Sequence, residues 1–423
     1  MTSQVTGHRR LVAMAAAAVA ATTLVAACSS GSQGGTSSSQ AGASSSQGGA
    51  SANSDVAASG SPVKIMATGI LATPAANFVE SVNGAEAAAD AINKAGGING
   101  HPIQIITCND NLNAADAIGC AREAVADHVI AYAGGDEPFD SGVFPYLQSA
   151  GIPWVGPLQN STTTETNSYS FPLEGESDVT STESGKLAVE KGGKRVVIIQ
   201  LSDAPASIFS ATFMASGVQS VGGTVAKLIG APIETVNWSS YAAQAMNADP
   251  DAITCSCSPQ NTPQLLQALR QAGYTGPLIE PSTEFLTSGI KSLGSAAGKV
   301  YLISTMRDPD VPYAGLTQYL DEMKATQPVS ALRDQTSELS WLSVHVIADL
   351  LQGQKSLTSA TLLKQLQTTK GVNGHGLIPS GVNWSKPGPL AKYPRIPDSD
   401  VLIYQWENGK LVALNGQFIQ AIG

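Results

Sequence analysis

The chain has 423 residues, with 23 Lys and Arg, 33 Asp and Glu, and a formal net charge of -10 at pH 7. This length predicts more than one domain with a large buried core. The acidic charge, without any basic stretch interleaved with aromatic residues, argues against nucleic acid as a partner.

The first 28 residues are ordered like a secretory signal. Positive charge at residues 8–10 precedes an alanine-rich apolar run over residues 11–24. That run is shorter than the roughly 20 apolar residues of a membrane-spanning helix, which favours cleavage over a permanent span. The small residues before Cys28 resemble a bacterial lipoprotein signal, which implies loss of residues 1–27 and lipidation of Cys28. Two alternatives stay open: cleavage nearby that leaves a free thiol, and twin-arginine export through the adjacent arginines.

A tether is predicted next, over residues 28–61. Residues 29–61 are almost entirely Ser, Gly, Ala and Gln, with Asp55 as the one charge, so they cannot bury enough apolar surface to fold. A Gly/Ser chain of this length reaches about 30 Å. A lipid on Cys28 and this tether together indicate a protein anchored to the outer face of the cell membrane.

From residue 62 onward, β-rich apolar runs alternate with helical patterns, which is typical of βαβ units and parallel sheets. The first group predicts strands at 63–68, 103–108, 129–133 and 152–155, with helices at 75–95, 114–127 and 141–150. The second group predicts helices at 179–191, 206–221, 241–247 and 263–272, with strands at 195–201, 224–228, 252–255 and 277–279. The remainder predicts a strand at 300–305, helices at 314–326, 338–351 and 360–367, and a hairpin of 401–407 with 410–413.

These elements predict an α/β protein of two doubly wound, Rossmann-like lobes.

The cysteines after Cys28 form two close pairs in a compartment where disulfides persist. Cys108 and Cys120 flank a loop between a strand and a helix, and a disulfide there is expected to contribute about 3 kcal/mol or less. Cys255 and Cys257 could form a small disulfide, bind a soft metal, or fill a buried strand end. No histidine follows a metal-ligand spacing, so no metal site is predicted.

Three stretches carry a family resemblance: EAAADAINKAGGING at 86–100, AGIP at 150–153 and QAGYTGPL at 271–278. They resemble the type I periplasmic solute-binding proteins of the branched-chain amino acid (leucine-binding) group. The resemblance runs from about residue 63 to 413. It implies two lobes joined by three crossovers and a hinge, one with residues 63–180 plus about 306–355 and the other with residues 181–305 plus about 356–423. It also implies a ligand in the cleft between the lobes, and a monomer that hands this ligand to the permease subunits of an ABC importer.

Open parallel sheets bind ligands at the carboxyl ends of their strands, so the loops there supply the candidate ligand-binding residues. In the first lobe these are Asp136, Glu137, Phe139, Gln159, Asn160 and Ser161. In the second lobe they are Pro205, Ser207, Ser258, Ser282, Glu284 and Phe285.

The turn at Asp136 and Glu137 departs from the family pattern, in which hydroxyls and backbone amides of the first lobe hold a carboxylate. An acidic turn repels a carboxylate. If it faces the cleft, the ligand should offer donors or positive charge, as an amine, an amide or a polyol does. Alternatively, these two carboxylates cap the helix at Ser141 or lie in solvent.

The sequence therefore predicts capture of a small polar molecule, such as an amino acid or an amide, without chemistry and without a cofactor. It contains no GxSxG elbow, HExxH motif, P-loop or glycine fingerprint at the first helix. An extracellular sensor that signals to a membrane receptor or kinase is the main alternative. An enzyme built from Asp136, Glu137 and Glu284 is disfavoured because no nucleophile and base signature accompanies them.

Overall fold

The structure is a computed structural model that describes residues 58–71, 77–159, 161–258, 261–281, 290–328, 331, 333–414 and 416–422. Several predictions fall outside these residues: the signal, the lipidated Cys28, the tether up to residue 57, Asn160, Ser282, Glu284 and Phe285. The last residues of the predicted tether contact the folded part, since the amides of Ser59 and Gly60 both donate to the carbonyl of Gly100.

Lobe 1 contains a 5-stranded sheet with the order β2-β1-β3-β4-β5. Its strands are β1 (Val63–Gly69), β2 (Ile103–Asn109), β3 (Ala131–Ala133), β4 (Trp154–Val155) and β5 (Ser170–Phe171). Every neighbouring pair is parallel. The carboxyl ends of all these strands therefore lie at one edge of the sheet.

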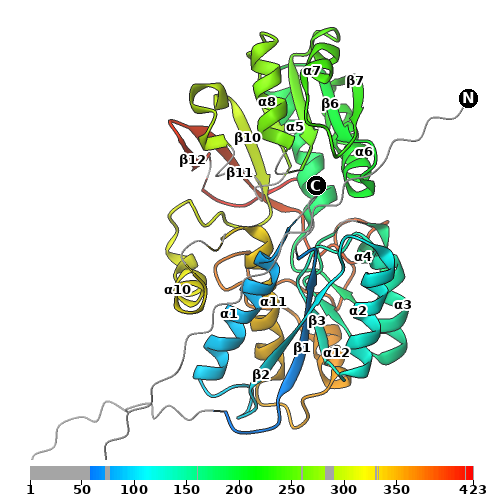
Figure 1. Ribbon diagram of the computed structural model, residues 1–423, viewed down its shortest axis with the longest axis vertical. Helices are drawn as coiled ribbons and strands as arrows, with labels where there is room; N and C mark the ends of the chain where they lie inside the picture. Colours follow the sequence, from blue (N-terminus) through cyan, green and yellow to red (C-terminus); the bar gives the residue numbers. More distant parts are fainter. Residues whose placement is uncertain are drawn as a thin grey trace, which may run out of the picture. The chain divides into compact units, whose positions relative to one another are not determined.

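Helices cover both faces of this sheet (Figure 1). One face carries α1 (Glu80–Lys94) and α11 (Gln335–Leu351), and the other carries α2 (Ala114–Ala126) and α3 (Asp140–Ala150). Alternation along β1 fits this arrangement, because Ile65 packs into the α1–α11 core and Met66 into the α2–α3 core. Helix α10 (Thr317–Thr326), after the 3₁₀ turn Ala314–Leu316, packs into the α1–α11 core as well.

Lobe 2 contains an 8-stranded sheet with the order β12-β11-β10-β9-β8-β6-β7, and β13 pairs with β11. Its strands are β6 (Arg195–Leu201), β7 (Thr224–Ala231), β8 (Ala252–Ser256), β9 (Leu278–Glu280), β10 (Val300–Ser304), β11 (Asp400–Glu407), β12 (Lys410–Ala413) and β13 (Ile419–Gln420). Strands β6 to β10 pair in parallel, and β11 returns antiparallel to β10 before the hairpin to β12.

The helices of lobe 2 also lie on both sheet faces. One core contains residues of α5 (Ser181–Lys191) and α6 (Pro205–Ser220), and the other contains residues of α7 (Ser239–Met246) and α8 (Asn261–Gln271). The predicted α/β fold with two doubly wound lobes is confirmed. Of the described helices, none is both long and apolar enough to cross a membrane.

Three chain segments run between the sheets: residues 172–180, residues 305–313 and the stretch that leads into β11. The first contains the short π-helix η1 (Glu176–Thr180). Hydrogen bonds tie these segments together and to both lobes. The hydroxyl of Thr305 donates to Glu174 over 2.6 Å, and the amide of Asp308 donates to the Tyr404 hydroxyl over 3.0 Å.

The predicted lobe boundary near residue 356 is placed too early. Helix α12 (Ser359–Thr368) and the loop up to Trp384 bury their apolar side chains in the α1–α11 core of lobe 1. Leu362 and Leu366 are fully buried there. The chain therefore returns to lobe 2 after Trp384, because the apolar face of α12 is covered by α11 and not by the second sheet.

Candidate functional site

Five buried carboxylates follow the carboxyl ends of the lobe 1 strands, and together we call them the acidic arc. Asp110 follows β2, Glu137 and Asp140 follow β3, Glu165 lies on α4 (Thr162–Thr166) after β4, and Asp178 lies on η1 after β5. Their exposed fractions are 0%, 4%, 2%, 0% and 0%, respectively. Because parallel strands end at one edge, the arc follows the sheet edge at which ligands of such folds bind.

Some carboxylates of the arc also support local structure. One oxygen of Glu137 accepts the amide of Phe139 over 2.8 Å, just before α3 begins. Asp140 accepts the hydroxyl of Ser161, which itself caps α4 by accepting the amides of Thr163 and Thr164. The Glu137 bond orders the residue that precedes α3, but no side chain caps the first turn of this helix.

Burial makes these carboxylates weak acids. Desolvation, aided by the charges of Asp110, Asp136 and Asp140, raises the pKa of Glu137 to about 8. Desolvation, aided by Asp178 and Asp140, raises the pKa of Glu165 to about 9. Glu137 and Glu165 therefore carry protons near neutral pH when no positive charge faces them.

Several acceptor atoms at this edge have no hydrogen-bond partner. In the part of the chain that the structure describes, they are Oδ2 of Asp110, both carboxylate oxygens of Glu165 and of Asp178, Oε1 of Gln159 and the hydroxyl of Thr68. The amides of Asp178 and Val179 lower the pKa of Asp178, but they do not meet hydrogen-bond geometry. Buried acceptors in proteins are usually satisfied, so this concentration marks the edge as a candidate binding site.

The predicted lobe 1 residues lie around the arc. The amide of Leu158 donates to the carbonyl of Gly135 over 3.1 Å, which places the loop of Gln159 next to the turn of Asp136. The side-chain Nε2 of Gln159 donates to the backbone carbonyl of Glu174. Phe139, by contrast, packs half-buried against the α2–α3 core. Ligand contact by these residues stays a prediction.

Three of the predicted lobe 2 residues are described, and each supports local structure, while ligand contact by them stays a prediction. The Ser207 hydroxyl accepts the amide of Leu201 over 2.8 Å and donates to the carbonyl of Ser256 over 2.6 Å, which joins the ends of β6 and β8. The Ser258 hydroxyl donates to Asn261, the first residue of α8, over 2.6 Å. Pro205 is the first residue of α6, where a proline fits because its missing N–H is not needed.

Sequence reasoning missed four members of the arc and the buried Glu280. Glu280 ends β9, is 1% exposed and accepts the Thr262 hydroxyl over 3.2 Å. A usable signal existed for Asp110 and Glu280, which are acidic residues at the ends of apolar strands. Glu165 and Asp178 gave none, because they lie on short helices without a hydrophobic period.

The structure pairs Cys108 with Cys120 in a disulfide, with their Cα atoms 5.7 Å apart. It also pairs Cys255 with Cys257, whose Cα atoms are 5.5 Å apart. Across the described residues, no group of three or more His, Cys, Asp or Glu could hold a metal ion.

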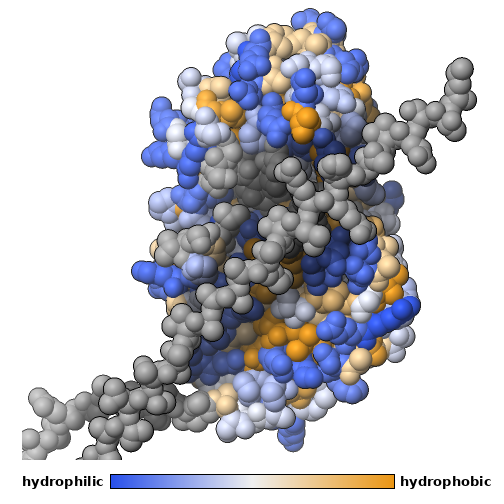
Figure 2. Space-filling view, in the orientation of Figure 1, coloured by the Kyte–Doolittle hydropathy of each residue, from blue (hydrophilic) through white to orange (hydrophobic). Residues whose placement is uncertain are grey.

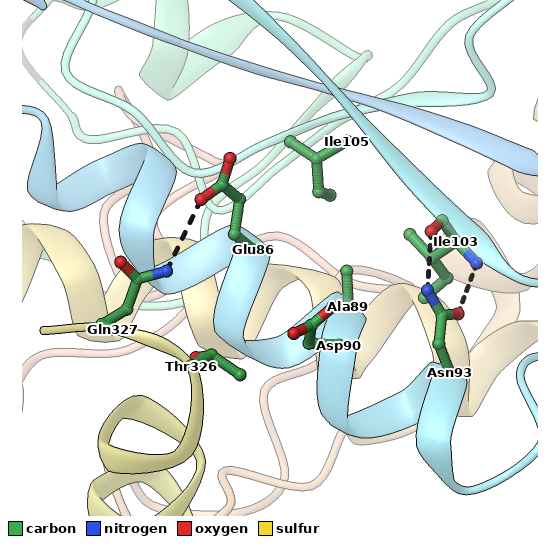
Figure 3. Close-up of a pocket in the computed structure, with 8 residues that line it drawn as sticks. All are labelled: Glu86, Ala89, Asp90, Asn93, Ile103, Ile105, Thr326 and Gln327. Carbon is green, nitrogen blue, oxygen red and sulfur yellow. Dashed lines mark hydrogen bonds between the residues drawn. The ribbon is translucent and has the colours of Figure 1, made fainter. Parts of the chain in front are cut away.

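A separate groove lies on the outside of lobe 1, between α1, β2 and the end of α10, and encloses about 280 Å³ (Figure 3). Its polar groups already have partners within the chain. Glu86 accepts from Gln327 over 3.5 Å, Asp90 lies 3.9 Å from Lys94, and Asn93 holds both backbone groups of Ile103. Figure 2 shows apolar residues gathered on the surface of lobe 1, which carries this groove. Because its polar groups already have partners, this groove is a weaker candidate for the ligand-binding site than the acidic arc.

Comparisons with known proteins agree with this fold. No curated protein matches the chain in sequence. Among solved structures, the branched-chain amino acid substrate-binding protein LivJ of Streptococcus pneumoniae, in complex with isoleucine, is similar, with 19% identity and a TM-score of 0.68 over 85% of this chain and 99% of that one. The leucine-binding protein LivK of Thermotoga maritima is 15% identical, with a TM-score of 0.69 over 85% and 99% of the two chains.

A solute-binding protein of an ABC transporter from R. palustris, in complex with 4-hydroxybenzoate, is 17% identical, with a TM-score of 0.69 over 85% of this chain and 97% of that one. At these identities the likeness shows a shared fold. The family model for periplasmic binding proteins matches residues 62–410, which include both lobes and the crossovers. The chain belongs to the periplasmic binding protein family.

Proposed function

We propose that the chain is the solute-binding lipoprotein of an ABC importer. It captures a small polar molecule, such as an amino acid or an amide, between its lobes and hands it to the permease subunits without changing it. The observation that carries the proposal is the set of unpartnered buried acceptors at the carboxyl edge of lobe 1, in a chain of this family. Relatives that bind isoleucine and 4-hydroxybenzoate support small-molecule capture by this fold.

Anchoring at the outer face of the membrane is a second part of the proposal, and it rests on the signal, Cys28 and the tether. We expect the mature chain to begin at a lipid-modified Cys28 and to sediment with membranes. A Cys28→Ser variant should be released into the medium or the periplasm. A mature N-terminus elsewhere, found by mass spectrometry of the membrane fraction, would remove the anchor.

Handover to a permease is tested by site-specific photo-crosslinking in native membranes. Val236 follows the carboxyl end of β7 and is 86% exposed, and Ala115 is exposed in the first turn of α2, after the carboxyl end of β2. A crosslinker at either position lies on the ligand-binding edge of its lobe. We expect permease subunits as the crosslinked partners.

Lys355 is the matched control position, because it is exposed beyond the carboxyl end of α11, away from that edge. A crosslinker there should capture the permease poorly. Capture of a membrane kinase or receptor from Val236 and Ala115 would contradict the importer and establish the sensor alternative.

A further inference from the structure

We propose that the acidic arc binds the positively charged group of an organic cation, a protonated amine or an amidinium. The inference rests on the proposed function and narrows its solute class. A protein that binds a cation in this way differs from one that binds amino acids, because lobe 1 of the latter must also bind the carboxylate of its ligand.

The strongest part of the arc is the pair of Glu165 and Asp178. Their carboxylates repel each other, are both 0% exposed, and present unpartnered oxygens from two different segments, α4 and η1. Two carboxylates held this way are unfavourable unless a proton or another positive group lies between them. A ligand ammonium or amidinium supplies both the charge and several N–H donors.

Neutral acceptors at the same edge point to the same chemistry independently. The Thr68 side chain is 2% exposed, and its unpartnered hydroxyl lies 3.5 Å from the position that a Cβ on Gly135 would occupy. Gln159 is 0% exposed. Its Nε2 donates to the Glu174 carbonyl, and its Oε1 has no hydrogen-bond partner. The Gln159 Oε1 can only accept, and the Thr68 hydroxyl can accept or donate, so both can serve a ligand that carries N–H donors.

No positively charged side chain in the described part of the chain neutralises the carboxylates of the acidic arc. Lys392 lowers the pKa of Glu165 from an exposed position. Arg395 is three residues after Lys392. Its guanidinium donates to the carbonyl of Ser170 and lies over the Phe171 ring, with its central carbon 4.5 Å from the ring centroid. An anionic ligand would find no partner for its charge at this edge, since Lys392 is exposed and Arg395 is already bound to Ser170 and Phe171.

Protons and the cation therefore compete for the arc. Without ligand, protons neutralise the carboxylates of Glu137 and Glu165, whose pKa values are raised to about 8 and about 9. When the cation binds, the arc ionises and releases protons to solvent, so that affinity rises as the pH rises. Protonated carboxyls with a purely structural role would show no such coupling.

The test is calorimetry on the full exported chain with two cationic probes, 1,4-diaminobutane and agmatine. We expect at least one of them to bind at least tenfold more tightly at about pH 8.5 than at about pH 6, with a heat that varies with the buffer because protons are released. Comparators are 1,4-butanediol, isoleucine and 4-hydroxybenzoate, and each should bind at least tenfold more weakly than the better cation.

Variants assign the effect to the arc. Glu165→Gln and Asp178→Asn should each weaken cation binding at least tenfold and reduce the proton release, with folding checked by thermal melting. Asp321→Asn, which changes an exposed acid on α10 outside both candidate sites, is the matched control and should leave both unchanged. Cation binding without pH dependence, or with the same strength in Glu165→Gln, overturns the inference.

Failure of the inference is distinguishable from failure of the proposed function. If isoleucine or 4-hydroxybenzoate binds best, or if neither cation binds, the arc does not recognise cations, while permease crosslinking from Val236 still upholds the importer. If the cations bind and Val236 captures a kinase, the solute class stands and the importer does not.

Discussion

Thr305 and Glu174 join two of the segments that connect the lobes, because the Thr305 hydroxyl donates to the Glu174 carboxylate over 2.6 Å. Both side chains are buried, and Gln335 at the start of α11 donates to the same hydroxyl over 3.3 Å. The crossovers are therefore coupled to lobe 1 by a polar contact that excludes water.

Replacing this hydroxyl should loosen the connection between the lobes. Thr305→Val leaves a buried carboxylate with one donor fewer, so we expect the free energy of unfolding to fall by about 1–3 kcal/mol. Denaturant titration measures this change. Thr368→Val is the control, since the Thr368 hydroxyl donates to a carbonyl at an exposed position, and its effect should stay within about 0.5 kcal/mol. Equal effects from both variants would contradict the role of Thr305.

Glycines at helix crossings give a second prediction. A Cβ on Gly217 of α6 would lie 2.0 Å from the Thr182 carbonyl oxygen of α5, so Gly217→Ala should destabilise the protein by about 1–3 kcal/mol. Gly119 of α2 has nothing within 4 Å of the corresponding position, so Gly119→Ala should stabilise it by about 0.5–1 kcal/mol through helix propensity. Thermal or chemical unfolding of both variants checks the opposite signs. A neutral Gly217→Ala would show that the helices are not packed this closely.

The acidic arc makes stability depend on pH. Glu137 and Glu165 have pKa values of about 8 and about 9 in the folded chain, against 4.5 for an unperturbed glutamate, so the folded state binds their protons more tightly than the unfolded state. Their contribution is present in full below about pH 4.5 and is lost as the pH rises toward 9.

The melting temperature of the ligand-free chain should therefore fall between pH 5 and pH 9, and Glu165→Gln should make the fall shallower. Asp321→Asn should keep the original slope, because Asp321 is exposed on α10. A melting temperature that rises over this range would contradict the raised pKa values.

The Cys108–Cys120 pair, 12 residues apart, should stabilise the chain by about 3 kcal/mol or less, because it restricts the unfolded state. Mass spectrometry before and after reduction should show the bond, and reductant should lower the denaturant midpoint. A chain with Cys255 and Cys257 both replaced by Ala should keep this sensitivity. A Cys120→Ala variant that still responds to reductant would assign the effect to another bond.

The sequence predicted elements with a long hydrophobic period and missed those without one. Strand β6 was predicted with its observed bounds, because its apolar run is continuous and flanked by helices. Helix α4 and strand β5 were missed because they have five and two residues. The allocation of α12 failed because its amphipathic pattern shows that one face is buried but not which sheet or helix covers it.

Residues of the site could be predicted only where a polar side chain directly follows a predicted strand. Glu137 was found because an acid in a turn after a strand is visible in sequence. The closeness of Glu165 and Asp178 depends on how α4 and η1 meet, which no spacing encodes. The hydroxyls of Ser207 and Ser258 bond to nearby backbone and amide groups, which the sequence did not predict, and ligand contact by these residues stays a prediction.

The central claim is that this chain captures a small molecule and releases it unchanged. The direct measurement is mass spectrometry of the chain purified with its bound solute, followed by denaturation, identification of the released molecule, and rebinding to the refolded chain. We predict one molecule per chain that rebinds with unaltered mass and shifts the melting temperature upward. A chain that carries no molecule in native form, or one that converts the added molecule to a different mass, would contradict the account.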